Sequence, residues 1–510
     1  MKTPDVKRWL VDFTKRINVD EEEEDAYPIP GRNDEQIQNV LWREVTACLS
    51  AALFHIPNGL SLSYAAVLIP QLEKVDSEIP ISKSDSAWIA SLIGLVVPIA
   101  SLLTGYLMDY IGRLRTIQIS VVPFVAGFFL MGTAASFEEI ILGRILTAVA
   151  MAMGTNPSIV YTAEIARPNL RGSVSSAGPL LSSFGLLMGY TLGFWFSWRD
   201  VALISSGVAL FPLLLTFVFS AESPEWLLST GKTEQALKTL QFLTDDTSRG
   251  GVADKRFDDL EQNILSKQQK HSETSLARVL KAYFSPAGYK PLLILMVLFT
   301  FQQLSGIYIT ISYAVTFFED VSVEINGSLS SIYLGLSRFI GGIFAVYMLK
   351  TVNRRPLLMI SSLIMAIFMF ISGYYSMLIS QGLSSATWVP IVCILGYMFT
   401  STIGLFSVPW VMTAEIFPLR FRGILQGTAI SWAYVALFFA VRSYRPLLDL
   451  LGGVYAVQWL FGLACILAIV FVWIFLPETH NQNLDQIEEY FVHNFVYLGK
   501  KRAQYTRIGS

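Results

Sequence analysis

The chain has 510 residues and a formal net charge of −2, which excludes a strongly basic nucleic-acid-binding protein. Hydrophobic residues make up 53% of it and charged residues only 15%, against roughly 25% charged residues in a soluble domain. A soluble fold of this size could not bury so much apolar surface, so we expect lipid to solvate much of the chain. The three cysteines stand far apart in or beside apolar stretches and form no disulfide framework or zinc-site spacing.

Twelve apolar stretches are long enough to cross a bilayer as helices, which takes about 20 mostly apolar residues each. Their apolar residues are continuous instead of alternating, which excludes a transmembrane β-barrel. In chain order the predicted spans cover residues 45–69, 86–107, 117–135, 140–161, 174–196, 201–220, 292–317, 329–349, 357–379, 388–413, 424–446 and 454–476.

A long polar segment, residues 221–290, separates the sixth span from the seventh. Ser223 and Pro224 suit the start of a helix, and Ala236, Leu240 and Leu243 recur at helical spacing. Two interpretations stay open: a helical latch beneath the bundle, or a solvated linker with marginal helices. The predicted parts are a tail (1–44), a six-helix bundle (45–220), the helical linker (221–290), a second six-helix bundle (291–476) and a second tail (477–510).

Positive residues in the short loops predict the orientation, because they favour the cytoplasmic side. Nine lie on the side of the N-terminus and five on the other, so both termini are expected in the cytoplasm. The polar start of the chain, with an acidic run at 21–25, does not resemble a signal peptide. The nine are Arg113, Arg115, Arg167, Arg171, Lys350, Arg354, Arg355, Arg420 and Arg422, against Lys74, Lys83, Arg199, Arg442 and Arg445.

Three motifs recur in the two halves in the same order and at nearly constant offsets. The offset is 251 residues between Glu164 and Glu415, and similar offsets relate the other two pairs. Parallel repeats of this kind mark a transporter whose site lies near the membrane midplane between the halves. The paired motifs are Asp109-x-x-Gly112-Arg113 with Lys350-x-x-Asn353-Arg354-Arg355, Ala163-Glu164-Ile165 with Ala414-Glu415-Ile416, and Glu222-Ser223 with Glu478-Thr479.

With these motifs, residues 45–490 resemble the sugar porters of the major facilitator superfamily. The resemblance implies an all-α membrane protein with twelve transmembrane helices in two pseudo-symmetric six-helix bundles and a cytoplasmic helical insert. Ser182-Ser183-Phe184-Gly185 and Arg338 look most like the insect facilitated trehalose transporter-like branch. Further motifs that carry the resemblance are Gly143-Arg144, Arg171-Gly172, Gln302-Gln303-Leu304-Ser305-Gly306-Ile307, Pro356-Leu357-Leu358, Pro409-Trp410 and Arg422-Gly423.

The resemblance implies that charged residues at the cytoplasmic span ends form ion pairs that close that side and part when the carrier opens inward. A network of pairs that can be made and broken is a bistable element. The alternative is that these charges only set the orientation in the membrane. That role needs only Lys and Arg, so it does not explain the carboxylates at matched positions. The expected gate residues are Asp109, Arg113, Arg144, Glu164, Arg171, Glu222, Arg354, Arg355, Glu415, Arg422 and Glu478.

Two amides lie about ten residues into the seventh span, roughly 15 Å deep at 1.5 Å per residue. Gln302 and Gln303 offer donors and acceptors without charge, which suits a neutral polyol, and the resemblance implies that they bind the sugar. The alternative is that one or both bond to a neighbouring helix. Trp410 is expected to stack on a sugar ring instead of anchoring at the interface, and Trp432 is a weaker candidate of the same kind.

The chain departs from the sugar-porter pattern at the expected pocket. Tyr308 and Arg338 stand where the family usually has Asn, so the pocket polarity is altered and the substrate is not copied from glucose carriers. A charge in a span must face the bundle interior and find a partner. Arg338 is therefore either a site for an anionic substrate or a structural or gating cation.

No Asp or Glu lies deep in a predicted span, and His55 is the intramembrane group that titrates near neutral pH. The sequence therefore favours passive facilitated transport of trehalose, glucose or a related hexose over a proton-coupled sugar or organic-anion porter. A non-transporting sugar sensor is a further alternative. No pattern of an enzyme, a cofactor or a metal site is present, so none is expected.

The expected partners are a small sugar and the lipid bilayer, without nucleic acid, and the chain is expected to act as a monomer in the plasma membrane. Asn326-Gly327-Ser328 forms a glycosylation acceptor in a predicted outside loop. The loop is short, so its modification stays an open expectation.

Overall fold

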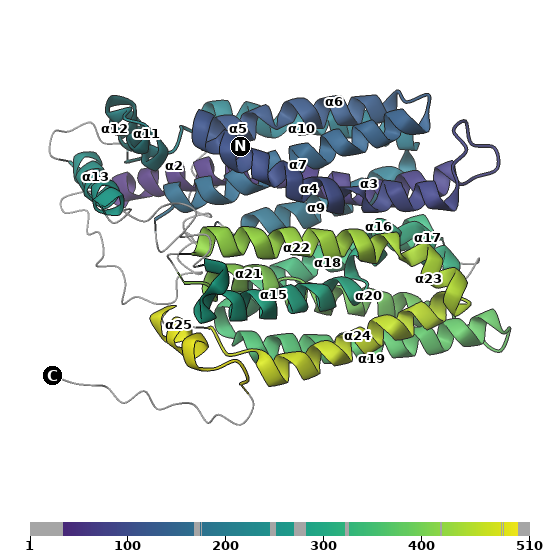
Figure 1. Cartoon of the computed structure of the whole chain (residues 1–510). Coiled ribbons are helices and arrows are strands. Elements are labelled where there is room, and N and C mark those ends of the chain that lie inside the picture. Colours follow the sequence, from purple (N-terminus) through teal and green to yellow (C-terminus); the bar gives the residue numbers. More distant parts are fainter. Residues whose placement is uncertain are drawn as a thin grey trace. The chain divides into compact units, whose positions relative to one another are not determined.

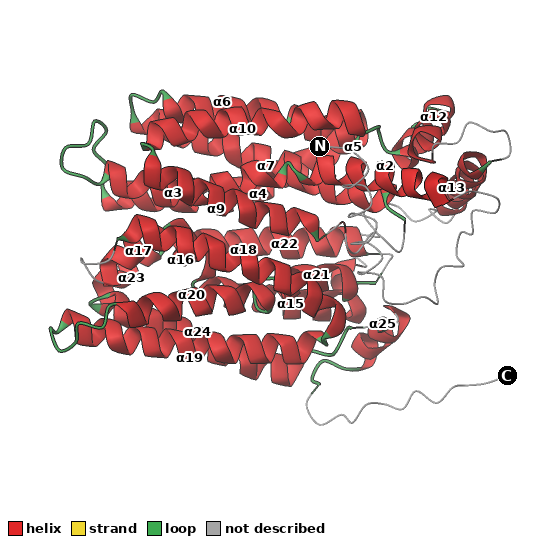
Figure 2. Cartoon of the chain, turned by 180° about the vertical axis from the view of Figure 1, so that it is seen from behind, coloured by secondary structure: helices red, strands yellow, loops and turns green. Residues whose placement is uncertain are grey.

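A computed structural model describes residues 34–167, 174, 176–244, 251–269, 282–321, 326–418, 421–480, 482 and 484–497, and the regular elements within these ranges are all helices (Figure 2). Ten of the helices are long and apolar enough to cross a membrane. The fourth and fifth predicted spans correspond to α7 (Phe137–Ile165) and α9 (Ala177–Trp195), which carry more polar and small residues. With these two, the described helices account for the twelve predicted spans.

The chain divides into two compact units, Met1–Pro80 with Val96–Ser272 and Ile81–Leu95 with Glu273–Ser510. Figure 1 colours the first mainly purple to teal and the second mainly green to yellow. Besides α7 and α9, the membrane helices of the first unit are α2 (Asp34–Ala52), α3 (His55–Leu72), the later part of α4 (Lys83–Ile111), α5 (Arg113–Ile119), α6 (Val121–Gly132) and α10 (Trp198–Phe219).

Several spans of the second unit are interrupted instead of continuous. The seventh span is made of three helices and the tenth of two, with turns between them. The helices of this unit are α15 (Pro286–Leu304), α16 (Ile307–Ser312), α17 (Ala314–Val321), α18 (Gly327–Thr351), α19 (Arg354–Ser380), α20 (Trp388–Ile403), α21 (Val408–Glu415), α22 (Arg422–Arg442), α23 (Tyr444–Leu451), α24 (Val454–Phe475) and α25 (Leu484–His493).

The first part of α4 groups with the second unit, which differs from the predicted division of the chain at the polar linker. The reason is close packing on α22. A Cβ added to Gly94 would lie 2.7 Å from the Phe438 nitrogen, so the two backbones are nearly in contact. The Arg442 guanidinium donates to the Ser84 carbonyl (2.8 Å) and lies 4.9 Å from the centre of the Trp88 ring.

Helices α3 and α9 approach each other through glycine. A Cβ on Gly59 would overlap the Ser182 carbonyl oxygen, and a Cβ on Gly185 would overlap the Ile56 carbonyl oxygen. Small residues let membrane helices pack at this separation, where van der Waals contact replaces the hydrophobic effect. Most residues of α3 are buried.

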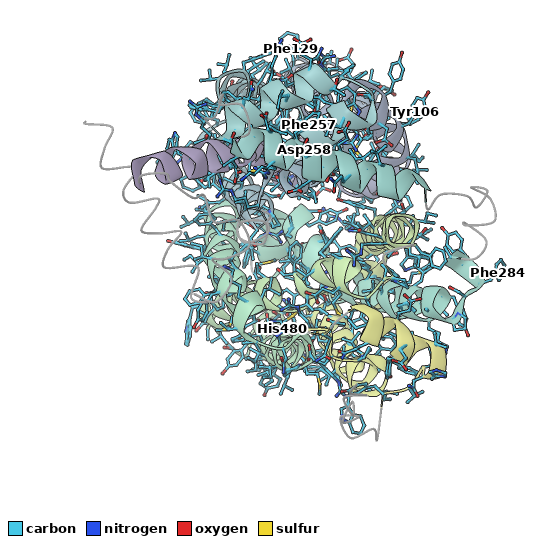
Figure 3. All side chains as sticks on the ribbon, turned by 90° about the vertical axis from the view of Figure 1, so that its left-hand side faces the viewer. Tyr106, Phe129, Phe257, Asp258, Phe284 and His480 are labelled. Atoms are coloured by element: carbon cyan, nitrogen blue, oxygen red, sulfur yellow. The ribbon has the colours of Figure 1, made fainter. Side chains whose placement is uncertain are left out.

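Large apolar side chains cover the outside of the first unit, as expected for a surface that faces lipid. Tyr106 on α4 and Phe129 on α6 are 76% and 57% exposed, and Figure 3 shows both at its periphery. A soluble protein of this size would rarely expose so many large apolar side chains together.

The described part of the polar linker includes α11 (Pro224–Ser229), α12 (Thr233–Thr244) and α13 (Val252–Gln269), at one end of the first unit (Figure 1). They are docked instead of freely solvated. The buried carboxylate of Glu44 on α2 accepts from Arg256 on α13 (2.7 Å) and from Arg167 after α7 (3.2 Å). Phe257, labelled on α13 in Figure 3, packs against the buried Trp226 and Leu227 of α11.

The glycine contact between α3 and α9 gives a direct test of the packing. Gly185→Ala should lower the stability by about 1–3 kcal/mol, because the added methyl group forces the two backbones apart. Thermal unfolding of the purified protein in detergent measures this loss. Gly207→Ala on α10 is the control, since its Cβ would meet no atom within 4 Å. Equal stability of the two variants would contradict the packing.

Candidate functional site

One end of the first unit is organised by a guanidinium–carboxylate pair. The Arg113 Nε at the start of α5 donates to both Glu164 oxygens at the end of α7, at 3.2 Å each. Ser223 also donates to the Glu164 carboxylate, and Arg113 Nη1 donates to Asp109 (3.0 Å). Glu164 and Arg113 are 11% and 14% exposed, whereas Asp109 is 70% exposed. We call this set of contacts, together with those of Glu222, the first circuit.

Glu222 joins the first circuit by capping α5. Its carboxylate accepts from the backbone nitrogens of Leu114 (2.9 Å) and Arg115 (3.3 Å). A negative charge at a helix N-terminus satisfies free N–H groups and is favoured by the helix dipole. Gly112 is required here, because it has a φ of 111° and a Cβ at this position would overlap the Glu222 carboxylate.

The second unit repeats this arrangement with its own residues, which we call the second circuit. Arg354 Nε donates to both Glu415 oxygens at 3.2 Å, and Nη2 donates at 2.7 Å. Thr479 donates to the same carboxylate at 2.8 Å, as Ser223 does in the first circuit. Glu478 accepts from the backbone nitrogens of Arg354 (2.9 Å) and Arg355 (3.1 Å) at the start of α19.

The two circuits differ where the sequence departs from its repeat. Lys350 stands in place of the carboxylate of Asp109, and Arg354 Nη1 donates to the Leu349 carbonyl. Asn353 replaces Gly112 without strain, since its φ is −59°. Arg355 takes a separate role, with its guanidinium carbon 4.4 Å from the centre of the Tyr497 ring.

Two other predicted gate residues, Arg144 and Arg422, are not placed in these circuits by any contact among the described residues. Arg144 is fully buried within α7 and donates to the Ser61 carbonyl on α3 (2.7 Å). It lies 20 residues before Glu164, which is about 30 Å along a helix. Arg422 begins α22, and its buried Nε and Nη2 have no hydrogen-bond partner among the described residues. Arg171 lies outside the described residues.

The two amides of the seventh span are buried and oriented differently. Gln302 Nε2 donates to the carbonyls of Leu405 (2.9 Å) and Phe406 (2.8 Å), in the turn between α20 and α21. Gln303 Nε2 donates to Gln302 Oε1 (3.2 Å). The buried Gln303 Oε1 has no hydrogen-bond partner among the described residues. Of the two, Gln303 is therefore the amide with hydrogen-bonding capacity to spare.

Aromatic rings of α15, α21 and α22 contact one another in the same unit. The Trp410 ring lies 5.2 Å from Phe299 and 6.0 Å from Tyr434, between centroids. Its buried Nε1 has no hydrogen-bond partner within the described ranges. Trp432 differs, because its Nε1 donates to the Met296 carbonyl and to Thr300 Oγ1, both at 3.0 Å, on α15.

Tyr308 and Arg338 both contact the ring of Phe406, which lies in the turn that breaks the tenth span. The Tyr308 ring lies 5.7 Å from Phe406 between centroids, and the Arg338 guanidinium carbon lies 4.1 Å from the centre of Phe406. Both side chains are buried. Stacking a cation on an aromatic face stabilises it where water is excluded.

The structure also reveals residues to which the sequence assigned no role in the site. Ser223 and Thr479 each follow a motif glutamate and donate to the circuit carboxylate. Their shared position directly after Glu222 and Glu478 was the available signal. Tyr397 on α20 donates to the Ser305 carbonyl at the end of α15 (2.6 Å). Among the described residues, no cluster of three His, Cys, Asp or Glu side chains could hold a metal ion.

The fold matches that of a solved transporter. The chain is similar to the partially occluded inward-open xylose transporter XylE from E. coli, with a TM-score of 0.71 and 24% identity, over 87% of this chain and all of that one. A family model described as "Sugar (and other) transporter" matches residues 8–491, and the chain belongs to that family. The protein is thus a multi-pass membrane transporter, and its fold is that of the solved transporter.

Curated relatives lie within the same group of transporters. The chain is 29% identical over 452 residues to the facilitated trehalose transporter Tret1 of Apis mellifera ligustica, covering 88% of each protein. It is 27% identical over 466 residues to the facilitated trehalose transporter Tret1-2 homolog of Drosophila sechellia, covering 91% of this chain and 93% of the relative.

The first circuit predicts a large difference between two carboxylates that bind one arginine. Glu164→Gln should lower the stability by about 3–5 kcal/mol, because it leaves the largely buried Arg113 without its main counter-charge. Asp109→Asn should cost about 0–1 kcal/mol, since that carboxylate is exposed. Thermal unfolding in detergent compares them. Equal losses would show that the Glu164 pair does not organise this end of the unit.

Proposed function

We propose that the protein is a facilitative transporter of a small neutral sugar, such as trehalose, glucose or a related hexose. The observation that carries the proposal is the polar cluster of the second unit. Gln303 offers an uncharged acceptor, and Trp410, which lies beside the Phe299 ring, offers an uncharged donor. Hydroxyl groups of a sugar supply the matching donors and acceptors, and a sugar ring packs on an indole face. Tyr434 contacts Trp410, and Tyr308 contacts Phe406 of the same broken span.

The relatives support the same class of substrate. Two curated proteins that cover most of this chain are named facilitated trehalose transporters. Membership of the sugar (and other) transporter family agrees with them. These relatives are only 27–29% identical to this chain, and Tyr308 and Arg338 alter its pocket. Transport measurements therefore decide whether the pocket selects monosaccharides or disaccharides.

Passive transport is supported by the residues of the first span. No Asp or Glu occurs in α3, which the structure describes in full. The His55 ring fills the space beside Gly178 on α9, and its Nδ1 lies 3.0 Å from the Ala52 carbonyl oxygen. These contacts favour a packing role for His55. Likewise, the Phe406 ring beneath Arg338 favours a structural role for this cation over an organic-anion site.

We further propose that the two circuits act as ion-pair gates during alternating access. Each joins the ends of different helices within one unit, so opening at that end requires these bonds to rearrange. The distribution of positive residues supports cytoplasmic termini, and the proposed location is the plasma membrane. Asn326 is exposed, and its side-chain oxygen caps α18, which leaves its amide nitrogen for a glycan. A monomer suffices for this cycle.

Uptake into proteoliposomes tests the proposed function. Labelled trehalose and glucose should each be offered with and without an inward proton gradient and a protonophore. We expect at least one sugar to equilibrate at a rate that neither the gradient nor the protonophore changes. Protein-free liposomes are the control. Accumulation driven by the gradient would establish coupling, and failure to take up either sugar would favour the anion porter or the sensor.

A further inference from the structure

The tenth span is broken at a proline that leaves one carbonyl without its usual partner. In a continuous helix, the Leu405 carbonyl would accept from the nitrogen four residues later. That residue is Pro409, which has no N–H. The turn of residues 404–407 separates α20 from α21 at this point. In a membrane such a group must find a donor inside the protein, because an unsatisfied one is costly.

Gln302 supplies the missing donor from a different span. Its Nε2 donates to the Leu405 carbonyl at 2.9 Å and to the Phe406 carbonyl at 2.8 Å. An amide nitrogen carries two hydrogens, so both are engaged at this turn. The side chain is fully buried, and its oxygen accepts from Gln303.

The contact is reciprocal, because α20 caps the break in the seventh span. α15 ends at Leu304, and Gly306 takes a left-handed φ of 87° before α16 begins. The hydroxyl of the buried Tyr397 on α20 donates to the Ser305 carbonyl at this break, at 2.6 Å. Each broken span thus satisfies a backbone group of the other.

We propose that Gln302 is a positioning residue that holds the break of the tenth span, and with it the indole of Trp410, while Gln303 contacts the substrate. This inference rests on the proposed sugar transport for its functional consequence. The structural part stands on hydrogen bonds from side chains to backbone carbonyls alone. Tyr397 holds the opposite break in the same way, so the two interrupted spans form one hinge pair.

A double-mutant cycle separates this role from direct sugar binding. Gln302→Met keeps the side-chain length and removes the amide, and Pro409→Ala restores an N–H that can bond to the Leu405 carbonyl. In the natural background, Gln302→Met should lower the melting temperature by about 3–6 °C, since it leaves buried carbonyls unsatisfied. In the Pro409→Ala background, the same change should cost less than half as much.

Sugar transport supplies the second readout. The sugar KM and the maximal uptake rate lost in Gln302→Met should be partly recovered when Pro409→Ala is added. Gln303→Met is the matched comparison. It should raise KM by about 5- to 10-fold through lost hydrogen bonds, lower the melting temperature less, and show no rescue by Pro409→Ala.

Two results would overturn the proposal: equal losses of melting temperature in the two backgrounds, or recovery of neither transport parameter in the double variant. Both would mark Gln302 as a direct ligand or as a residue that the break does not need. If the natural protein transports no sugar, the melting-temperature cycle still decides the positioning role. Failure of the sugar proposal and failure of this one are therefore distinguishable.

Discussion

Partly buried arginine–glutamate pairs at helix ends are the constraint on which each unit depends. A guanidinium with little solvent contact needs a counter-charge and fixed geometry, and Arg113 and Arg354 find both in Glu164 and Glu415. Because each arginine starts one helix and each glutamate ends another, the pair fixes how the helix ends meet. In the proposed transport cycle these bonds rearrange when that end opens, so we propose that the same pairs also act as the gate.

The apolar surroundings impose a second constraint, which is that every backbone group must be satisfied within the protein. Glycine and proline interrupt the spans, and side chains from neighbouring helices repair the loss. Gln302 bonds to the turn before Pro409, and Tyr397 bonds to the carbonyl of Ser305. The polar groups that remain near Trp410 are those that a ligand can use. Some of these polar atoms thus hold the backbone, and the others remain for the proposed substrate.

Much of the architecture was predictable because lipid demands long apolar helices and a duplicated sequence repeats its motifs. The matched positions of Glu164 and Glu415 indicated paired circuits, and the family match confirms the class of protein. The orientation of Gln302 was not predictable, since its partner is a break in a helix 103 residues away. The role of Glu44 was not predictable either, because its partner Arg256 lies 212 residues away in the sequence. Arg144 carried the family motif, but it is buried within α7 and donates to the Ser61 carbonyl on α3.

A facilitative sugar carrier of the proposed kind exchanges sugar across the membrane with a single set of alternating sites. Counterflow measures this most directly. Proteoliposomes are loaded with unlabelled trehalose or glucose, diluted, and given a trace of the same labelled sugar without any ion gradient. A carrier of this kind predicts a transient accumulation of label above equilibrium that unloaded vesicles lack. Identical time courses in loaded and unloaded vesicles, for both sugars, would contradict the account.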